Sequence, residues 1–165
     1  KVKIENLNIN YVKENKPLGT LGAVSKIKNF NHDYILITNS DVLTNMNYEN
    51  FFLDFIKQNA DMSIATVSYE VGIPYAVLET SDKRVLSFKE KPTYSYYSNA
   101  GIYLLKKSIL DHIPVDKFYN ATDLIEELIK KEKKVCSYPL TDYWLDIGNH
   151  SDYQRAQNEF KNIKF

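Results

Sequence analysis

Apolar runs that end in a polar residue alternate along this chain with segments of helical periodicity. Residues 34–41 (YILITNSD) and 143–148 (YWLDIG) have the pattern of buried strands, and each carries an aspartate near its end, Asp41 or Asp146. Residues 51–56 and 124–129 repeat apolar side chains at three- and four-residue spacing, as core-facing helices do. Strands separated by helices favour an α/β, Rossmann-like fold: a mostly parallel, mixed sheet with helices on both faces.

Further elements are expected around these segments. The patterns predict strands at residues 8–12, 62–69, 100–105 and 135–138, and a hairpin formed by residues 75–79 and 85–89. They also predict helices at residues 21–28, after Asn47, from Asn120, and after a cap at Asn149 or Ser151. With 165 residues the chain is long enough for one domain.

Asp41 and Asp146 are the first candidates for chemistry. A carboxylate at the carboxyl end of a strand in an open α/β sheet lies where such folds bind ligands. Two of them at neighbouring strand ends could hold one Mg²⁺, which prefers oxygen ligands and often bridges to substrate phosphates. Their spacing alone does not establish that they meet, so two ordinary strand-end aspartates are the alternative.

Four other segments carry candidate ligand contacts. Glycines in Leu18-Gly19-Thr20 would let the backbone approach a flat ligand, although glycine before a helix is common. Lys91, preceded by Glu90 and followed by proline, could neutralise a phosphate, or could simply end an exposed hairpin.

Asn99 lies beside a glycine in a strand pattern, which suits either hydroxyl recognition or a bulge. Trp144, two positions before Asp146, is either a ligand platform or a core residue.

Charge and cysteine content exclude several classes of partner. Lys plus Arg equals Asp plus Glu, at 21 each, so no net field attracts nucleic acid or an anionic membrane. The single cysteine, Cys136, cannot form an internal disulfide or a cysteine-rich metal site. The sequence contains no pattern of a membrane span or signal peptide. These features predict a cytoplasmic protein.

Six segments in a fixed order carry a family resemblance. They are LGTLGA at 18–23, NSD at 39–41, PYAV at 74–77, EKP at 90–92, NAGIY at 99–103 and YWLDIG at 143–148. Together they resemble the sugar-1-phosphate nucleotidyltransferases, and the resemblance covers essentially the whole chain. The ending of the last segment is most similar to the mannose-1-phosphate guanylyltransferase-like members of bacterial surface-polysaccharide pathways.

The resemblance implies a substrate set and a reaction. A sugar-1-phosphate would attack the α-phosphorus of a nucleoside triphosphate, giving a nucleotide sugar and pyrophosphate, and phosphoryl-type transfer of this kind depends on positioning and charge neutralisation. No protein nucleophile is required.

The resemblance also implies a role for each candidate residue. Asp41 and Asp146 would bind Mg²⁺, with Lys91 as the third catalytic residue. The nucleotide would meet Leu18, Gly19, Thr20 and Asp41, and the sugar phosphate would meet Tyr75, Ala76, Glu90, Lys91, Asn99 and Trp144. Ala76 departs from the family, which often has glycine there, so a small shift in sugar fit is expected.

One family segment is missing from the printed chain. The family begins with a strand and a glycine-rich loop that wraps the triphosphate, whereas this chain opens at Lys1 and has no such loop. We therefore expect residues 1–165 to be the C-terminal portion of a longer nucleotidyltransferase domain. We also expect this portion to be inactive alone, and to expose a sheet edge or apolar patch that a second copy could cover in a homo-oligomer.

The sequence constrains the nucleotide, the sugar and the class of protein less closely than it constrains the family resemblance. GTP with mannose-1-phosphate or an amino-sugar-1-phosphate is preferred, while thymidylyl and uridylyl transfer stay open. One alternative is a non-catalytic regulatory or scaffold relative, which would not need to retain Asp41, Lys91 and Asp146. The other is a nucleotide-sugar-dependent glycosyltransferase, which would usually carry a pair of acids separated by one residue, and Asn39-Ser40-Asp41 lacks the first acid.

Overall fold

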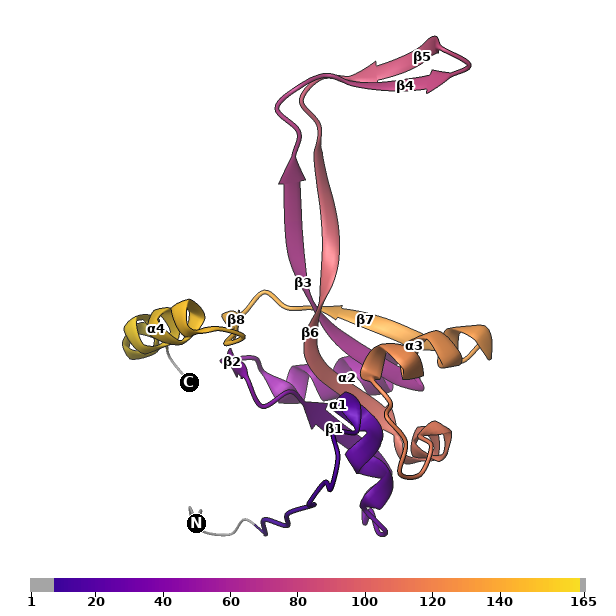
Figure 1. Ribbon diagram of the computed structural model, residues 1–165, viewed down its shortest axis with the longest axis vertical. Coiled ribbons are helices and arrows are strands. Elements are labelled where there is room, and N and C mark those ends of the chain that lie inside the picture. Colours follow the sequence, from indigo (N-terminus) through magenta and orange to yellow (C-terminus); the bar gives the residue numbers. More distant parts are fainter. Residues whose placement is uncertain (1–7, 164–165) are drawn as a thin grey trace.

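A four-stranded mixed sheet forms the centre of the molecule in the computed structural model, which describes residues 8–163 (Figure 1). Its strands, in spatial order, are β1 (Tyr34–Thr38), β6 (Thr93–Lys106), β3 (Met62–Gly72) and β7 (Val135–Pro139). β6 is antiparallel to both of its neighbours, and β3 is parallel to β7. The mixed sheet was expected. Three of its strands share one direction, but only one neighbouring pair is parallel because β6 is inserted between β1 and β3.

Helices cover both faces of this sheet. Alternate residues of β6 belong to two separate hydrophobic clusters, as the two-residue period of a strand requires. One cluster contains Phe51 and Phe55 of α2 (Tyr48–Gln58). The other contains Leu124 and Leu128 of α3 (Ala121–Lys130), together with residues of α1 (Gly19–Gly22) and of the 3-10 helix η2 (Lys107–His112). The expected two-sided α/β architecture is therefore present.

Local signals define where these helices begin. The side chain of Asn47 accepts a hydrogen bond of 2.9 Å from the amide of Asn50 and caps α2. The amide of Asn120 donates to Asp123 Oδ2 at 2.8 Å at the start of α3. Asn149 caps α4 (His150–Glu159) by accepting from the amide of Asp152 at 3.0 Å. These starts agree with those predicted from the sequence.

Two expectations for the amino-terminal part are wrong. Residues 8–12 form no strand, and in the described part of the chain they pair with none. The helix expected at residues 21–28 is only one α-helical turn, α1, followed by the 3-10 helix η1 (Ala23–Lys26). The backbone of residues 117–119 crosses so close to this short helix that a Cβ at Gly22 would lie 2.5 Å from the Lys117 carbonyl oxygen.

A long ribbon extends from the sheet. The outer halves of β3 and β6 continue as a two-stranded arm, in which Tyr69 is paired with Tyr96. The predicted hairpin, β4 (Val77–Ser81) and β5 (Arg84–Lys89), forms the far end of this arm (Figure 1). Asp82 and Lys83 connect its strands with positive φ values of 46° and 65°. This is the backbone that two-residue hairpin turns adopt to match strand twist.

One edge of the four-stranded sheet is β1, which within the described residues pairs with β6 alone. Tyr34 and Leu36 on this strand are 39% and 47% exposed, and Phe52 and Ile56 of α2 are exposed as well. β1 is thus a sheet edge that carries exposed apolar side chains, and whether a second copy covers it stays a prediction. Among residues 8–163, no helix is long and apolar enough to cross a bilayer.

Candidate active site

Asp41 and Asp146 lie side by side at one end of a small two-stranded sheet. Its strands are β2 (Val42–Thr44) and β8 (Trp144–Asp146), which run antiparallel with Val42 opposite Asp146. The amide of Ile147 donates to the carbonyl oxygen of Asp41 at 2.8 Å, which joins the two segments directly. The start of β2 therefore meets the end of β8.

The two aspartates meet by a different route from the one predicted. Asp41 does not end a strand of the main sheet, because β1 stops at Thr38 and Asp41 comes directly before β2. Asp146 ends a strand, but β8 pairs with β2 and lies outside the main sheet. Antiparallel pairing, rather than neighbouring parallel strand ends, brings these two residues together.

Both carboxylates are available to a ligand. Asp41 and Asp146 are exposed, and within residues 8–163 neither carboxylate has a hydrogen-bond or ion-pair partner. The same residues contain no group of three or more His, Cys, Asp or Glu side chains suited to a metal. Two carboxylates alone fit Mg²⁺, which usually keeps several waters and takes its other ligands from substrate phosphates.

A cavity of about 340 Å³ opens beside Asp41. Its lining combines residues from α1, β1, the loop after β1, and β6: Thr20, Leu21, Ile37, Thr38, Asn39, Ser40, Asp41 and Tyr103. Burial raises the pKa of the Tyr103 phenol, an effect that its hydrogen bond with Asn99 opposes. The predicted base turn (residues 18–20) and the Asp41 loop therefore share one cavity, although no pattern in the sequence links them.

The base turn is held by a segment one hundred residues further along the chain. The amide of Tyr119 donates to the Leu18 carbonyl oxygen at 2.8 Å, and the amide of Leu21 donates back to the Tyr119 carbonyl oxygen at 3.0 Å. The amide of Ala121, the first residue of α3, donates to Thr20 Oγ1 at 2.7 Å. Tyr119 is not among the residues predicted from the sequence, because its contacts with Leu18 and Leu21 are made by backbone groups and leave no sequence signal.

A bulge in β6 is hydrogen-bonded both to the loop after β1 and to β8. The pairing of β3 with β6 shifts between Ile64 and Thr66, and Gly101 has a φ of +74°. The carbonyl oxygen of Gly101 accepts from the amide of Asn39 at 2.8 Å. The indole of Trp144 donates to the Ala100 carbonyl oxygen at 2.9 Å. Trp144 therefore braces the bulge, and its half-buried ring agrees with the core alternative.

Asn99 also supports this bulge. Its Oδ1 accepts from the amide of Gly101 at 2.9 Å, and its Nδ2 donates to the Tyr103 hydroxyl at 2.9 Å. Both ends of the amide are used within β6 itself. The structure therefore contains the bulge that the sequence offered as an alternative to hydroxyl recognition.

The remaining predicted site residues lie on the arm. Tyr75 and Ala76 are on the β3-to-β4 side, Glu90 and Lys91 are on the β5-to-β6 side, and all four are exposed. The far part of the arm stands away from α1, β2 and β8 (Figure 1). The structure consequently brings the base turn, Asp41 and Asp146 to one region and leaves these four residues apart from it.

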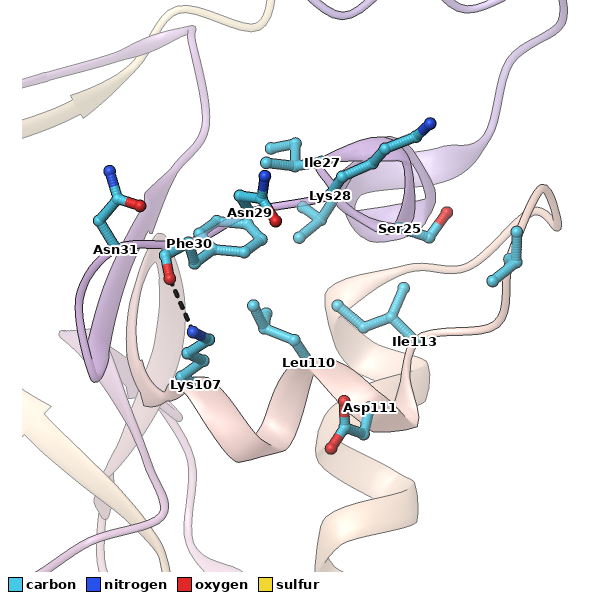
Figure 2. Close-up of a pocket in the computed structure, with 12 residues that line it drawn as sticks. Ser25, Ile27, Lys28, Asn29, Phe30, Asn31, Lys107, Leu110, Asp111 and Ile113 are labelled. Atoms are coloured by element: carbon cyan, nitrogen blue, oxygen red, sulfur yellow. Dashed lines mark hydrogen bonds between the residues drawn. The ribbon is translucent and has the colours of Figure 1, made fainter.

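A second cavity, of about 550 Å³, contains none of the predicted site residues. It lies between η1, the loop that follows η1, and η2, with Ile27, Leu110 and Ile113 on its walls (Figure 2). Lys107 Nζ donates to the Phe30 carbonyl oxygen at 2.7 Å and ties the loop to η2.

Comparison with known proteins decides the family. The sequence profile described as Nucleotidyl transferase matches residues 1–163. The chain belongs to the nucleotidyl transferase family. It is 31% identical over 162 residues to the D-glycero-α-D-manno-heptose 1-phosphate guanylyltransferase of Aneurinibacillus thermoaerophilus, which covers 96% of this chain and 70% of the relative.

Other proteins with related names are similar to this chain in sequence or in structure. The mannose-1-phosphate guanyltransferase of Schizosaccharomyces pombe is 28% identical over 156 residues, covering 90% of this chain and 43% of the yeast protein. The crystal structure of HddC from Yersinia pseudotuberculosis matches with a TM-score of 0.63 and 28% identity, covering 89% of this chain and 64% of that chain. A second HddC structure is complexed with GMP-PN. The chain thus spans between 43% and 70% of the lengths of these relatives.

Proposed function

We propose that this chain carries the nucleotide-binding half of a sugar-1-phosphate guanylyltransferase active site. One observation carries the proposal: the base turn, the Asp41 loop and Asp146 come together from three separate parts of the chain. Guanylyltransferases among the named relatives support GTP as the nucleotide. The product would be a GDP-sugar, made from GTP and a hexose- or heptose-type sugar-1-phosphate.

The proposed reaction is a substitution at the α-phosphorus of the nucleotide. A phosphate oxygen of the sugar-1-phosphate forms a bond to this phosphorus as the bond to the bridging oxygen breaks, and pyrophosphate leaves. Asp41 and Asp146 would hold Mg²⁺, which when bound supplies positive charge next to the transferring phosphate. The backbone of residues 18–20 would lie against the base and fix its position beside the cavity.

The lining of the cavity beside Asp41 carries no basic side chain. The residues that line the cavity include no lysine or arginine, so no cation among them faces a bound triphosphate. Lys91 is the proposed cation for the sugar phosphate, and it lies on the arm. We therefore propose that this chain binds nucleotide weakly and that turnover requires the arm to bend over the site and further basic groups to be supplied.

Calorimetric titration of GTP, dTTP, UTP and CTP, each with Mg²⁺, tests the nucleotide assignment. GTP should bind and the other three should bind more weakly. Asp41→Asn and Asp146→Asn should each weaken Mg²⁺-dependent GTP binding by about tenfold or more, because a neutral amide is a poor ligand for a hard cation. Asp82→Asn, the same change at the exposed tip of the arm, is the control and should leave binding unchanged.

Three results would each contradict a part of the proposal. Tight binding of another nucleotide in preference to GTP would overturn the guanylyl assignment. Equal binding by wild-type protein and both aspartate variants would remove these carboxylates from the site. Pyrophosphate release by this chain with GTP and mannose-1-phosphate would show that turnover needs no further basic groups.

A further inference from the structure

Tyr119 lies outside the candidate site but is joined by backbone hydrogen bonds to the base turn and to the residues that follow it. It does not line the cavity beside Asp41. Its amide donates to the carbonyl oxygen of Leu18 at 2.8 Å. Its own carbonyl oxygen accepts from the amides of Leu21 and Gly22 at 3.0 and 3.1 Å. The backbone of this one residue thus contacts Leu18 at the start of the base turn and the two residues that directly follow the turn.

The side chain of Tyr119 is held by α3, on the side away from the base turn. Its hydroxyl donates to Glu127 Oε2 on α3 at 2.7 Å. The second oxygen of Glu127 is 2.8 Å from Lys131 Nζ and 2.8 Å from His112 Nδ1 on η2. Burial, with the hydrogen bond to Glu127 next in importance, raises the pKa of the Tyr119 phenol well above its usual value. The hydroxyl therefore stays protonated and continues to donate.

The close fit around the turn allows little independent movement. A Cβ on Gly19 would lie 2.8 Å from the Tyr119 carbonyl oxygen, and one on Gly22 would lie 2.5 Å from the Lys117 carbonyl oxygen. A change in the position of residue 119 must therefore be followed by residues 18–22. Since Thr20 and Leu21 line the cavity, such a change would alter its wall.

We infer that Tyr119 is a positioning residue for the nucleotide: its phenol, anchored on Glu127, fixes the backbone that shapes the base turn. The inference rests on the proposed function, because it assigns the base turn to nucleotide binding. Tyr119 would control nucleotide affinity without contacting the nucleotide. Glu127, His112 and Lys131 would form the anchor on which this control depends.

The test uses Tyr119→Phe, which removes one oxygen and keeps the ring. Tyr143→Phe is the matched control, because the Tyr143 hydroxyl makes a comparable bond of 2.5 Å to Glu159 Oε2 on α4 and contacts no part of the base turn. Amide hydrogen exchange of Leu21 and Gly22 is measured without nucleotide, and the Kd for GTP with Mg²⁺ is measured by calorimetry. Glu127→Gln provides a conservative comparison, since its amide oxygen can still accept from Tyr119.

Loss of one hydrogen bond predicts effects of about threefold to tenfold. In Tyr119→Phe the two amides should exchange faster, and GTP should bind more weakly, by factors in this range. Glu127→Gln should lie between this variant and wild type, and Tyr143→Phe should match wild type in both measurements. A lower melting temperature with unchanged exchange at Leu21 and Gly22 would show a purely structural role and overturn the inference.

The two measurements separate this inference from the proposed function. If wild-type protein binds no nucleotide, the proposed function fails, whereas the exchange of Leu21 and Gly22 still decides whether Tyr119 controls the turn. If GTP binds but Tyr119→Phe changes neither exchange nor affinity, the positioning role is wrong and the function is unaffected.

Discussion

Gly19→Ala tests the physical basis of the base turn most directly. Gly19 has a φ of +76°, where an L side chain costs about 1–2 kcal/mol. The new Cβ would lie 2.7 Å from Asn120 Oδ1, a side-chain atom, and 2.8 Å from the Tyr119 carbonyl oxygen, a backbone atom. Asn120 can rotate away, but the backbone of residue 119 can move only by weakening its hydrogen bonds to the turn, at about 1 kcal/mol each.

Together these effects predict a loss of about 3 kcal/mol in the free energy of unfolding, and weaker nucleotide binding. Urea unfolding, followed by the fluorescence of the single tryptophan, Trp144, measures the free energy of unfolding. Gly72→Ala is the control, because its Cβ would meet only Thr93 Oγ1, at 3.9 Å. Both substitutions remove similar freedom from the unfolded chain. If Gly19→Ala were as stable as Gly72→Ala to within about 0.5 kcal/mol, the reasoning about this turn would be wrong.

Two further predictions concern the helices that support the site. Phe51 is fully buried and its neighbour Phe52 is 38% exposed. Phe51→Ala should therefore cost about 3–5 kcal/mol of stability in urea unfolding, and Phe52→Ala clearly less. Equal losses would mean that α2 does not pack on the sheet through the face that carries Phe51. Hydrogen bonds from Lys131 first, then from His112 and Tyr119, lower the pKa of Glu127 from 4.5 to about 2. Because the folded pKa lies below the unfolded one, this stabilisation is present above pH 4.5 and is lost as the pH falls toward 2. Wild-type protein should thus lose more free energy of unfolding than Glu127→Gln between about pH 5 and about pH 3. Equal losses in the two proteins would show that solvent screens the hydrogen bonds of Glu127 so strongly that they add no measurable stability.

Several elements follow from short stretches of sequence. Asn47 and the buried pair Phe51 and Phe55 specify α2, because a capping side chain and a four-residue apolar spacing act within a few turns of chain. The same holds for α3 and for the hairpin of β4 and β5. The strand expected at residues 8–12 fails for the complementary reason: alternating side chains make a strand only where a partner strand accepts its backbone hydrogen bonds.

The six ordered segments predicted the family, and the matches to known proteins agree with it. The structure places residues 18–20, Asp41 and Asp146 near one another, and their roles in binding stay predictions. Glu90 and Lys91 show the limit of this reasoning. Their order in the sequence is the same whether the arm lies over the cavity or extends away from it, and the structure has it extended (Figure 1).

The sequence by itself determined α2, α3, α4, the hairpin and the choice of candidate residues, because each depends on side chains a few positions apart. Only the tertiary structure decided that β2 pairs with β8 and so places Asp41 beside Asp146, and that Tyr119 holds the base turn. Both contacts join segments about one hundred residues apart through backbone groups, which every residue except proline carries in the same form. Packing of the two hydrophobic clusters chooses those partners, and no local pattern in the sequence encodes that choice.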